Sequence, residues 1–507
     1  MSDSPRADSP AVPLPGSPPA PPPGCPAHGT GPGGVQRLYG PGVSADPMGV
    51  YDRLRAEHGA VAPVLLEGDV PAWLVLGYQE ILHIVRNPRR FSRDGRNWRE
   101  WQEGRVQPHS PIAPVLAWGP DCTHQDGSEH QRLRRAVNES LERFDRRGLR
   151  RNVVYYGHKL IDRFSESGRT ELLGQYAQQL PMLVLTNLFG LPEDEGPRLV
   201  KASRQLLMGT EKAVTADQYI QRTLGALVTR KHEEPGHDLT SWLIAHPSDL
   251  SDAEVSHHLR LVMIAANEST TNLIAGTLRM VFTHPRFHGS VRGGRLTLPS
   301  AVEQVLWDEP PISVCPGGFA AYDMELAGHT VRRGDVLLLG LAAGNTDPGI
   351  RPQPGAIMHG NRSHLSFTCG PHECPGQDIG RAITGTGIEV LLGRLPDIRL
   401  TVEPDALSWS ASTWSRHLDA LPVAFTPHGA VHPERPPTPG AAAPRVESPA
   451  TRPGGRTAAP GRRGARARPP RWRGLLGRLR RLGRRAAPRH ARPEAPGAGS
   501  GRTPKPG

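Results

Sequence analysis

Apolar residues recur at helical spacing through the middle of the chain. Stretches of this kind, each with a charged opposite face, cover residues from about 146 to 165, 172 to 190, 194 to 209 and 215 to 232. This period predicts amphipathic helices. Leu191-Pro192 and Pro235-Gly236 separate some of them, because proline and glycine interrupt regular structure. The pattern therefore predicts a mainly helical central region.

A longer apolar helix is expected next. Ser251-Asp-Ala-Glu254 places Glu three residues after Ser, which is the pattern of a capping box, and the apolar run continues to about Thr283, before His284-Pro285. Short strand-like runs follow at Met324–Leu326, Val336–Leu341 and Leu421–Phe425. The expected fold class is mainly α with small β-sheets.

The two ends of the chain lack these patterns. Residues 1–34 are rich in Pro, Gly, Ser and Ala, and residues 429–507 are rich in Arg, Pro, Gly and Ala. Such segments cannot bury enough apolar surface to offset their chain entropy, so we expect both to be disordered. The sequence predicts one large globular domain over residues 35–428.

The net charge of +12 is unevenly distributed. From Gly429 onward there are 18 Arg and 1 Lys against 3 Glu, a balance of +16, whereas residues 1–428 carry 42 basic and 46 acidic side chains, a balance of −4. The high pI therefore belongs to the tail. The globular part gives no electrostatic reason to expect nucleic-acid binding.

Cysteine usage and the absence of apolar spans indicate the cellular compartment. The five cysteines are odd in number and widely scattered: Cys25, Cys122, Cys315, Cys369 and Cys374. Their spacing suggests neither a disulfide framework nor a zinc site, which suits a reducing cytoplasm. No secretion signal begins the chain, and no stretch approaches the ~18 apolar residues of a membrane span. We expect a cytoplasmic protein without an N-terminal membrane anchor.

One short loop carries the most specific chemistry. Residues 367–376 read Phe-Thr-Cys-Gly-Pro-His-Glu-Cys-Pro-Gly, so Cys374 is presented just before a helical pattern. A helix N-terminus favours an anionic sulfur, and Gly370 and Gly376 permit tight turns and close approach to a flat cofactor. A lone cysteine in such a loop also fits a buried structural residue.

The loop resembles the haem-binding loop of the cytochrome P450 family. The matching pattern is Phe367-x-x-Gly370-x-x-x-Cys374-x-Gly376. The resemblance implies haem b as cofactor, with the Cys374 thiolate as the axial ligand of its iron. Other family-like segments occur in the same order over most of residues 35–428, with the character of soluble actinomycete members.

Polar residues interrupt the long apolar helix at Ala265-Ala-Asn-Glu-Ser-Thr-Thr271. Burying such groups without partners is costly, so a solvent-facing polar stripe is one interpretation. The family has Ala-Gly-x-Asp/Glu-Thr here. The resemblance implies that Glu268 and Ser269, with Thr270 assisting, handle oxygen and protons, while Ala266 stands where Gly is usual.

Candidate propionate-binding residues lie in two segments. His130 and Arg134 are four residues apart, so both can reach one anion from the same helix face; an ordinary solvated basic face is the alternative. The family has His-x-x-x-Arg at this place, binding the haem propionates. His364, just before the cysteine loop, matches another propionate-binding position.

Several positions depart from the family pattern. The helix that normally carries Glu-x-x-Arg has Gln304 and Trp307 at those two places. The loss of both members of a buried pair can be nearly neutral, because Gln304 can still form hydrogen bonds and Trp307 can fill the volume. Gly318 falls where an arginine usually binds a propionate, and Thr368 replaces the first glycine of the loop. A small set of streptomycete relatives carries a similar Glu-Gln-x-Leu-Trp.

The basic tail contains an amphipathic segment at residues 471–485. Trp472 and four leucines fall at helical spacing with arginines between them. This pattern is typical of weak binding to an anionic membrane surface. A charged, disordered extension is the alternative, and nucleic acid is a minor one.

The resemblance implies a monooxygenase that inserts one oxygen atom from O2 into a small organic substrate, in secondary metabolism. No flavin-binding region is evident, so electrons are expected from a separate ferredoxin and its reductase. The main alternative is a haem-binding sensor or scaffold without monooxygenase activity, because of Gln304 and Trp307. A peroxide-driven activity without ferredoxin is the third.

Overall fold

The computed structural model describes residues 34–435 apart from 41–42, 44, 208–212, 284–296, 354–355, 357 and 359. Most of the two expected disordered ends, and the amphipathic segment 471–485, lie outside the described residues. Residues 429–435 are described, and Val431 and His432 donate backbone hydrogen bonds to Asp162 at 3.0 and 2.9 Å. The packed part of the chain therefore extends slightly beyond residue 428.

Helices make up most of the described chain. They are α2 (Pro47–His58), α3 (Tyr78–Val85), α4 (Arg99–Gln102), α5 (Ala113–Leu116), α6 (Gly127–Leu141), α7 (Arg146–Ile161), α8 (Gln179–Phe189), α9 (Gly196–Leu207), α10 (Ala213–Glu233), α11 (Leu239–Ile244), α12 (Asp252–Thr283), α14 (Leu298–Asp308), α15 (Leu341–Asn345) and α16 (Gln377–Arg394). The four helices predicted between residues 146 and 232 are confirmed as α7 to α10. The stretch predicted from 172 begins as a π-helical turn, Leu173–Ala177, before α8.

The capping box of the long helix is confirmed. The Glu254 carboxylate accepts the backbone N–H of Ser251 at 2.8 Å, and the Ser251 hydroxyl accepts the N–H of Glu254 at 3.3 Å. These two bonds satisfy backbone donors that the first turn leaves free. They fix the start of α12, the longest of the described helices.

The largest sheet has six strands in the order β1-β2-β3-β9-β6-β4. Its members are β1 (Gln36–Arg37), β2 (Val61–Leu66), β3 (Val70–Val75), β9 (Val336–Gly340), β6 (Val314–Ala320) and β4 (Phe91–Ser92). The smaller sheets contain β5 (Arg169–Glu171), β7 (Met324–Leu326), β8 (His329–Val331), β10 (Arg399–Leu400), β11 (Trp409–Ala411), β12 (Arg416–Leu418) and β13 (Pro422–Ala424). The predicted strands β7, β9 and β13 are confirmed, and the other strands, β1 to β3 among them, were not predicted.

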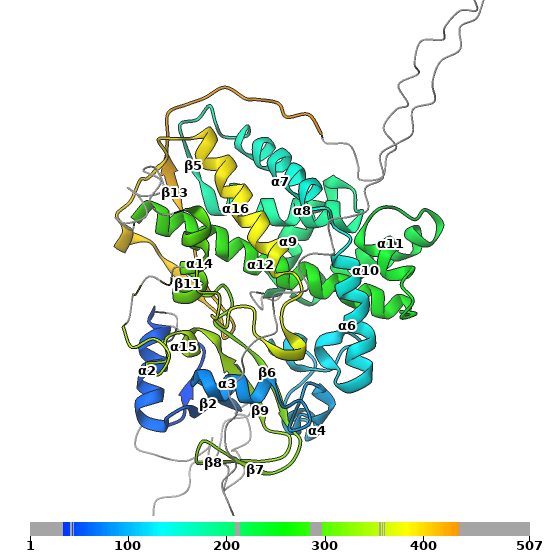
Figure 1. The fold of residues 1–507 in the computed structure, drawn as a ribbon, viewed down its shortest axis with the longest axis vertical. Helices are drawn as coiled ribbons and strands as arrows, with labels where there is room; N and C mark the ends of the chain where they lie inside the picture. The colour runs from blue at the N-terminus through cyan, green and yellow to red at the C-terminus, as the bar shows by residue number, and fades with distance from the viewer. Residues whose placement is uncertain are drawn as a thin grey trace, which may run out of the picture. The chain divides into compact units, whose positions relative to one another are not determined.

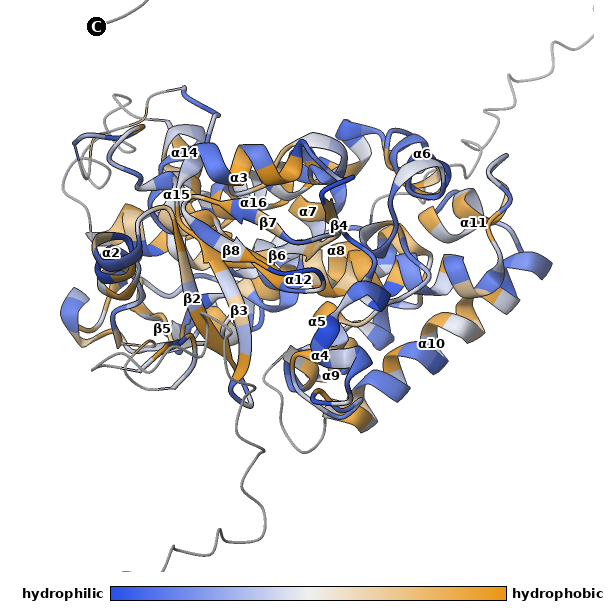
Figure 2. Ribbon diagram, turned by 90° about the horizontal axis from the view of Figure 1, so that it is seen from below, coloured by the Kyte–Doolittle hydropathy of each residue, from blue (hydrophilic) through white to orange (hydrophobic). Residues whose placement is uncertain are grey.

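Three helices form the centre of the helical part. Figure 1 shows α16 lying beside α7, with α12 running across them. One large cluster of buried apolar side chains joins these helices with α8 to α10. In Figure 2, α8 is hydrophobic almost throughout, whereas α10 alternates between hydrophobic and hydrophilic residues. Thus α8 is a core helix and α10 an amphipathic outer one.

Candidate functional site

The cysteine loop is closed by its own backbone. The N–H of Cys374 donates to the carbonyl of Phe367 at 2.9 Å, and Gly376 caps α16 immediately afterwards. Gly370 has φ +75°, and a Cβ there would lie 2.9 Å from the carbonyl of Val85, so this position requires glycine. Thr368 has φ +55°, a conformation that the family's glycine adopts without strain.

The two thiols of the loop lie in different surroundings. Cys369 packs against an apolar cluster with residues of α3. Burial raises the pKa of Cys374, whereas the N–H of Gly376 and the charges of Arg134 and Arg381 lower it. Burial outweighs these effects and leaves the pKa of Cys374 above its ordinary value, but Arg134 and Arg381 beside the start of α16 are the surroundings that favour its thiolate.

Helix α6 brings two of the predicted residues to this loop. Arg134 donates to the carbonyl of Glu373, next to Cys374. The rings of His130 and His372 lie 4.1 Å apart between centroids. His130 is buried, and its Nε2 has no hydrogen-bond partner among the described residues. Burial, together with the charges of His372 and Arg134, lowers the pKa of His130 to about 4.

His364 lies in a different group of residues, behind the loop. Its Nε2 is 3.1 Å from Oε2 of Glu303 in α14, and Arg381 of α16 donates to the same carboxylate from Nε at 2.7 Å. Burial raises the pKa of Glu303, but hydrogen bonds from His364 and Arg381 outweigh it and lower the pKa to about 2. The buried Nδ1 of His364 has no hydrogen-bond partner among the described residues.

Phe367 is held between the side chains of Arg381 and His364. The Arg381 guanidinium lies 4.5 Å from the centre of its ring, and the His364 ring lies 5.7 Å away. A cation over an aromatic face is attracted by the ring quadrupole. The start of the cysteine loop is thereby attached to α16.

Gln304 and Trp307 form hydrogen bonds in place of the missing ion pair. The Gln304 side chain accepts the N–H of Met358 at 2.9 Å and donates to the carbonyl of Ala356 at 3.2 Å. The fully buried Trp307 donates from Nε1 to the carbonyl of Asn361 at 2.8 Å. The expectation that these two side chains would bind and fill the space is confirmed, and they connect α14 to the segment that precedes the cysteine loop.

The centre of α12 orients the other predicted residues. The Ser269 hydroxyl donates to the carbonyl of Ala265 at 2.7 Å, one turn back, which leaves its lone pairs available. Asn272 donates to the Glu268 carboxylate at 3.2 Å. Thr270 is buried, and a Cβ on Gly380 of α16 would lie 3.9 Å from its hydroxyl oxygen. Ser269 and Glu268 are half-buried, whereas Thr270 faces α16.

These residues fit a haem with two propionates. Cys374 supplies a soft sulfur ligand at a helix start, and the unpartnered donor or acceptor atoms of His130 and His364 offer buried sites for carboxylate oxygens. Among the described residues, no group of three or more His, Cys, Asp or Glu side chains could hold a metal ion by itself.

His372 and Arg381 were not predicted as site residues from the sequence. His372 lies two residues before Cys374, inside the very loop that carries the resemblance, and contacts His130. Its short distance from the ligand in sequence was a usable signal. Arg381 had none, because its partner Glu303 is 78 residues away.

Comparison with known proteins identifies similar chains. No family model matches. The chain is 30% identical over 367 residues to mycinamicin IV hydroxylase/epoxidase of Micromonospora griseorubida, covering 70% of this chain and 89% of that one. It is 29% identical over 395 residues to the cytochrome P450 monooxygenase PikC of Streptomyces venezuelae, covering 76% and 92%. The structure of a myxobacterial cytochrome P450, CYP267B1, with myristic acid superimposes with a TM-score of 0.69 at 28% identity, covering 77% and 99%.

Proposed function

The chain belongs to the cytochrome P450 family of haem-thiolate monooxygenases, and we propose that it hydroxylates or epoxidises a small organic molecule of secondary metabolism with electrons from a ferredoxin. The observation that carries the proposal is the position of Cys374, at the start of α16 and beside Arg134 and Arg381. One of the two relatives is named as a hydroxylase and epoxidase, and the other as a monooxygenase. Haem, when bound, supplies the iron at which O2 is activated.

We assign haem binding to residues of the cysteine loop, of α6 and of the segment that contains His364. Cys374 binds the iron, and Phe367, Gly370 and Gly376 shape its loop. His130 and Arg134 of α6 hold one propionate, in our proposal with help from His372, which the ring contact with His130 supports. For His364 only the unpartnered Nδ1 supports a propionate contact, because Glu303 already occupies Nε2.

Proton delivery is assigned to the centre of α12. Ser269 holds a water on its free lone pairs, since its proton is donated to Ala265. Glu268 passes protons toward that water, and Asn272 keeps its carboxylate in place. A positioned acid of this kind contributes typically ~10²–10⁴-fold to a rate. Thr270 faces α16, and we assign it only an assisting role in proton delivery.

The electron donor is proposed to bind where α6 ends and α7 begins. Arginines 143, 146, 147, 150 and 151 are exposed there. A groove beside them is lined by α6 residues together with Pro371 and His372 of the cysteine loop. Arg146 pairs with Asp378 of α16, four residues after Cys374, and this supports binding of an acidic ferredoxin near the cysteine loop. A ferredoxin reductase would complete the chain.

The C-terminal tail adds a proposed weak contact with anionic membrane surfaces through its arginines. None of the described helices is long and apolar enough to cross a bilayer. The tail segment that would make the proposed contact lies outside the described residues.

The deciding experiment is the carbon monoxide difference spectrum of the reduced protein. We expect a strongly red-shifted Soret band in the wild type and in Cys369→Ala, and its loss in Cys374→Ala, because only a thiolate ligand shifts the band this far. A band at the position of a neutral ligand in the wild type would favour the alternative of a haem-binding sensor or scaffold. NAD(P)H-dependent product formation with a ferredoxin and reductase then tests the oxygenase, and peroxide alone tests the third alternative.

A further inference from the structure

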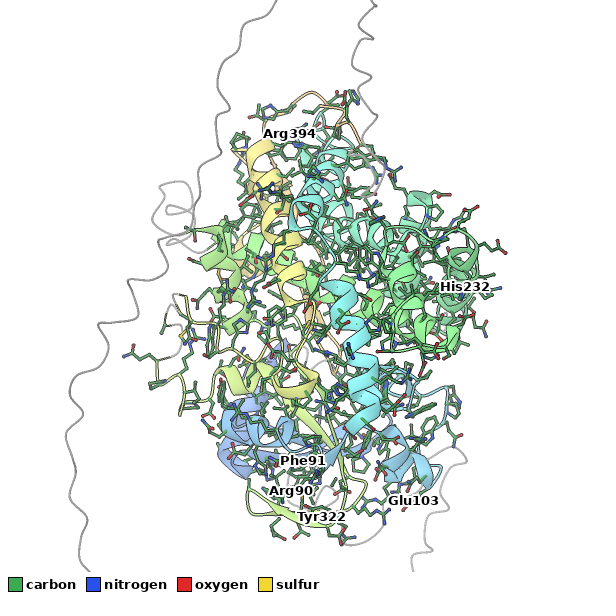
Figure 3. The ribbon with its side chains drawn as sticks, turned by 45° about the vertical axis from the view of Figure 1, so that its right-hand side comes forward. Arg90, Phe91, Glu103, His232, Tyr322 and Arg394 are labelled. Carbon is green, nitrogen blue, oxygen red and sulfur yellow. The ribbon has the colours of Figure 1, made fainter. Side chains whose placement is uncertain are left out.

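The backbone around Gly318 excludes the arginine that the family places there. Gly318 lies at a bulge in β6, with φ +126°. A Cβ at this position would lie 2.7 Å from the carbonyl oxygen of Ser92 and 3.1 Å from that of Phe91. Both contacts are with backbone atoms of β4, so no side chain fits unless the strand moves. Figure 3 shows this edge, where Arg90 and Phe91 lie near Tyr322.

Arg93 follows β4 directly and reaches the same edge. Its Nη1 donates to the carbonyl of Pro316 at 2.6 Å, two residues before Gly318. The backbone N–H of Arg93 and the hydroxyl of Ser92 both donate to Oδ2 of Asp126, at 2.8 and 2.7 Å. These bonds attach the residue to β6 on one side and to the start of α6 on the other.

The charge of Arg93 is held in an unusual environment. Its side chain is half-buried, and burial lowers the pKa of the guanidinium. No carboxylate of the described residues lies within 4.0 Å of the guanidinium nitrogens, because Asp126 meets its backbone rather than its side chain. A cation that is partly withdrawn from water without an ion-pair partner is costly. An anion bound in the same place would remove that cost.

The neighbours of Arg93 are the other candidate propionate-binding residues. Its positive charge lowers the pKa of both His130 and His372, so the three side chains lie within electrostatic range of one another. His130 also has a buried Nε2 without a partner among the described residues. Asp126 is the one acidic side chain in this group, and Ser92 and the backbone of Arg93 occupy its Oδ2.

We propose that Arg93 binds a haem propionate in place of the arginine that Gly318 has replaced. A guanidinium gives a carboxylate two parallel charge-assisted hydrogen bonds. The cation would then lie at the end of β4, the strand paired with β6, and its charge acts on His372 of the cysteine loop. The proposal rests on haem binding by this family member.

The test measures haem retention rather than turnover. Arg93→Gln and Arg93→Lys are compared with the wild type by the rate at which haem transfers to apomyoglobin. Arg96→Gln is the matched control, because Arg96 is exposed and already paired with Asp94. We expect haem loss to accelerate about tenfold in Arg93→Gln, which corresponds to roughly one charge-assisted hydrogen bond. Arg93→Lys is expected to lie in between, and Arg96→Gln to match the wild type.

Reconstitution with haem dimethyl ester separates propionate binding from a structural role. Esterification removes the propionate charge, so the penalty of Arg93→Gln should largely disappear with the ester. The same penalty with both haems would overturn the proposal, because the substitution would then act through the Pro316 contact alone. An unchanged rate with ordinary haem would also overturn it. A wild-type protein without a thiolate-type Soret band would instead contradict the proposed function.

Discussion

In the proposed proton relay, the Ser269 hydroxyl holds the water that delivers protons to the oxygen site. Replacing it with Ala removes the hydroxyl, so we expect product formation to fall about 10²-fold and hydrogen peroxide per NAD(P)H to rise. Ser269→Thr keeps the hydroxyl and should retain most activity. Product and peroxide are measured together in the reconstituted system. If Thr270→Ala uncouples more than Ser269→Ala, the relay runs through Thr270 instead.

Glu303 links stability to pH. Its carboxylate is 9% exposed and its pKa is lowered to about 2, so it stabilises the fold above its ordinary pKa of 4.5 and loses that effect as the pH falls toward 2. Glu303→Gln should lower the free energy of unfolding by about 3 kcal/mol at neutral pH, because His364 and Arg381 lose a charged partner.

The measurement for Glu303 is denaturant unfolding between pH 7 and pH 3. The difference between the wild type and Glu303→Gln should narrow below pH 4.5, because the Glu303 carboxylate of the unfolded chain takes up a proton there, while that of the folded protein stays ionised until about pH 2. Glu325→Gln is the control, since Glu325 is exposed. A difference that stays constant down to pH 3 would show that the negative charge is not what stabilises the fold.

At the scale of elements, α14 shows how one ion pair is replaced by hydrogen bonds. Trp307→Arg places a guanidinium in a fully buried site beside Gln304, which cannot neutralise it. We expect a loss of about 3 kcal/mol in unfolding free energy. Adding Gln304→Glu should recover most of this loss. Thermal unfolding of the two single variants and the double variant gives the coupling energy. Additive losses would mean that Gln304 and Trp307 act independently.

Helices and strands could be predicted where the spacing of their apolar residues was regular. Helices α7 to α10 and α12 have a regular period and, in α12, a capping box, so they could be predicted. Strands β2 and β3 are continuous apolar runs, which periodicity cannot separate from buried helix. Pro63 and Pro71 lie within them, and proline is unfavourable inside a strand because it cannot donate a ladder hydrogen bond.

Site residues could be predicted where a local sequence motif defines them, but not where their role depends on contacts with distant parts of the chain. Cys374 could be predicted because its loop is a contiguous motif. Arg93 could not, because its relation to Gly318 depends on the pairing of β4 with β6, more than 200 residues apart. The partners of Gln304 and Trp307 likewise lie in a segment that sequence alone does not place against α14.

At the scale of the whole molecule, the basic tail should be separable from catalysis. A chain ending at residue 435 keeps every described contact, so its Soret band and melting temperature should equal those of the full chain. Sedimentation with anionic vesicles should fall after truncation, and salt should weaken the binding of the full chain. Loss of haem on truncation would assign the tail a structural role instead.

The close approach of β4 to Gly318 also bears on the history of this protein. An arginine at position 318 would bring a side chain into the backbone of Ser92. The single substitution Gly318→Arg is therefore not tolerated while β4 keeps its position. Changes in strand position and in the cation at position 93 would have to come together. The bulge thus disfavours every larger residue at position 318. Proteins that descend from this chain are therefore expected to keep the glycine.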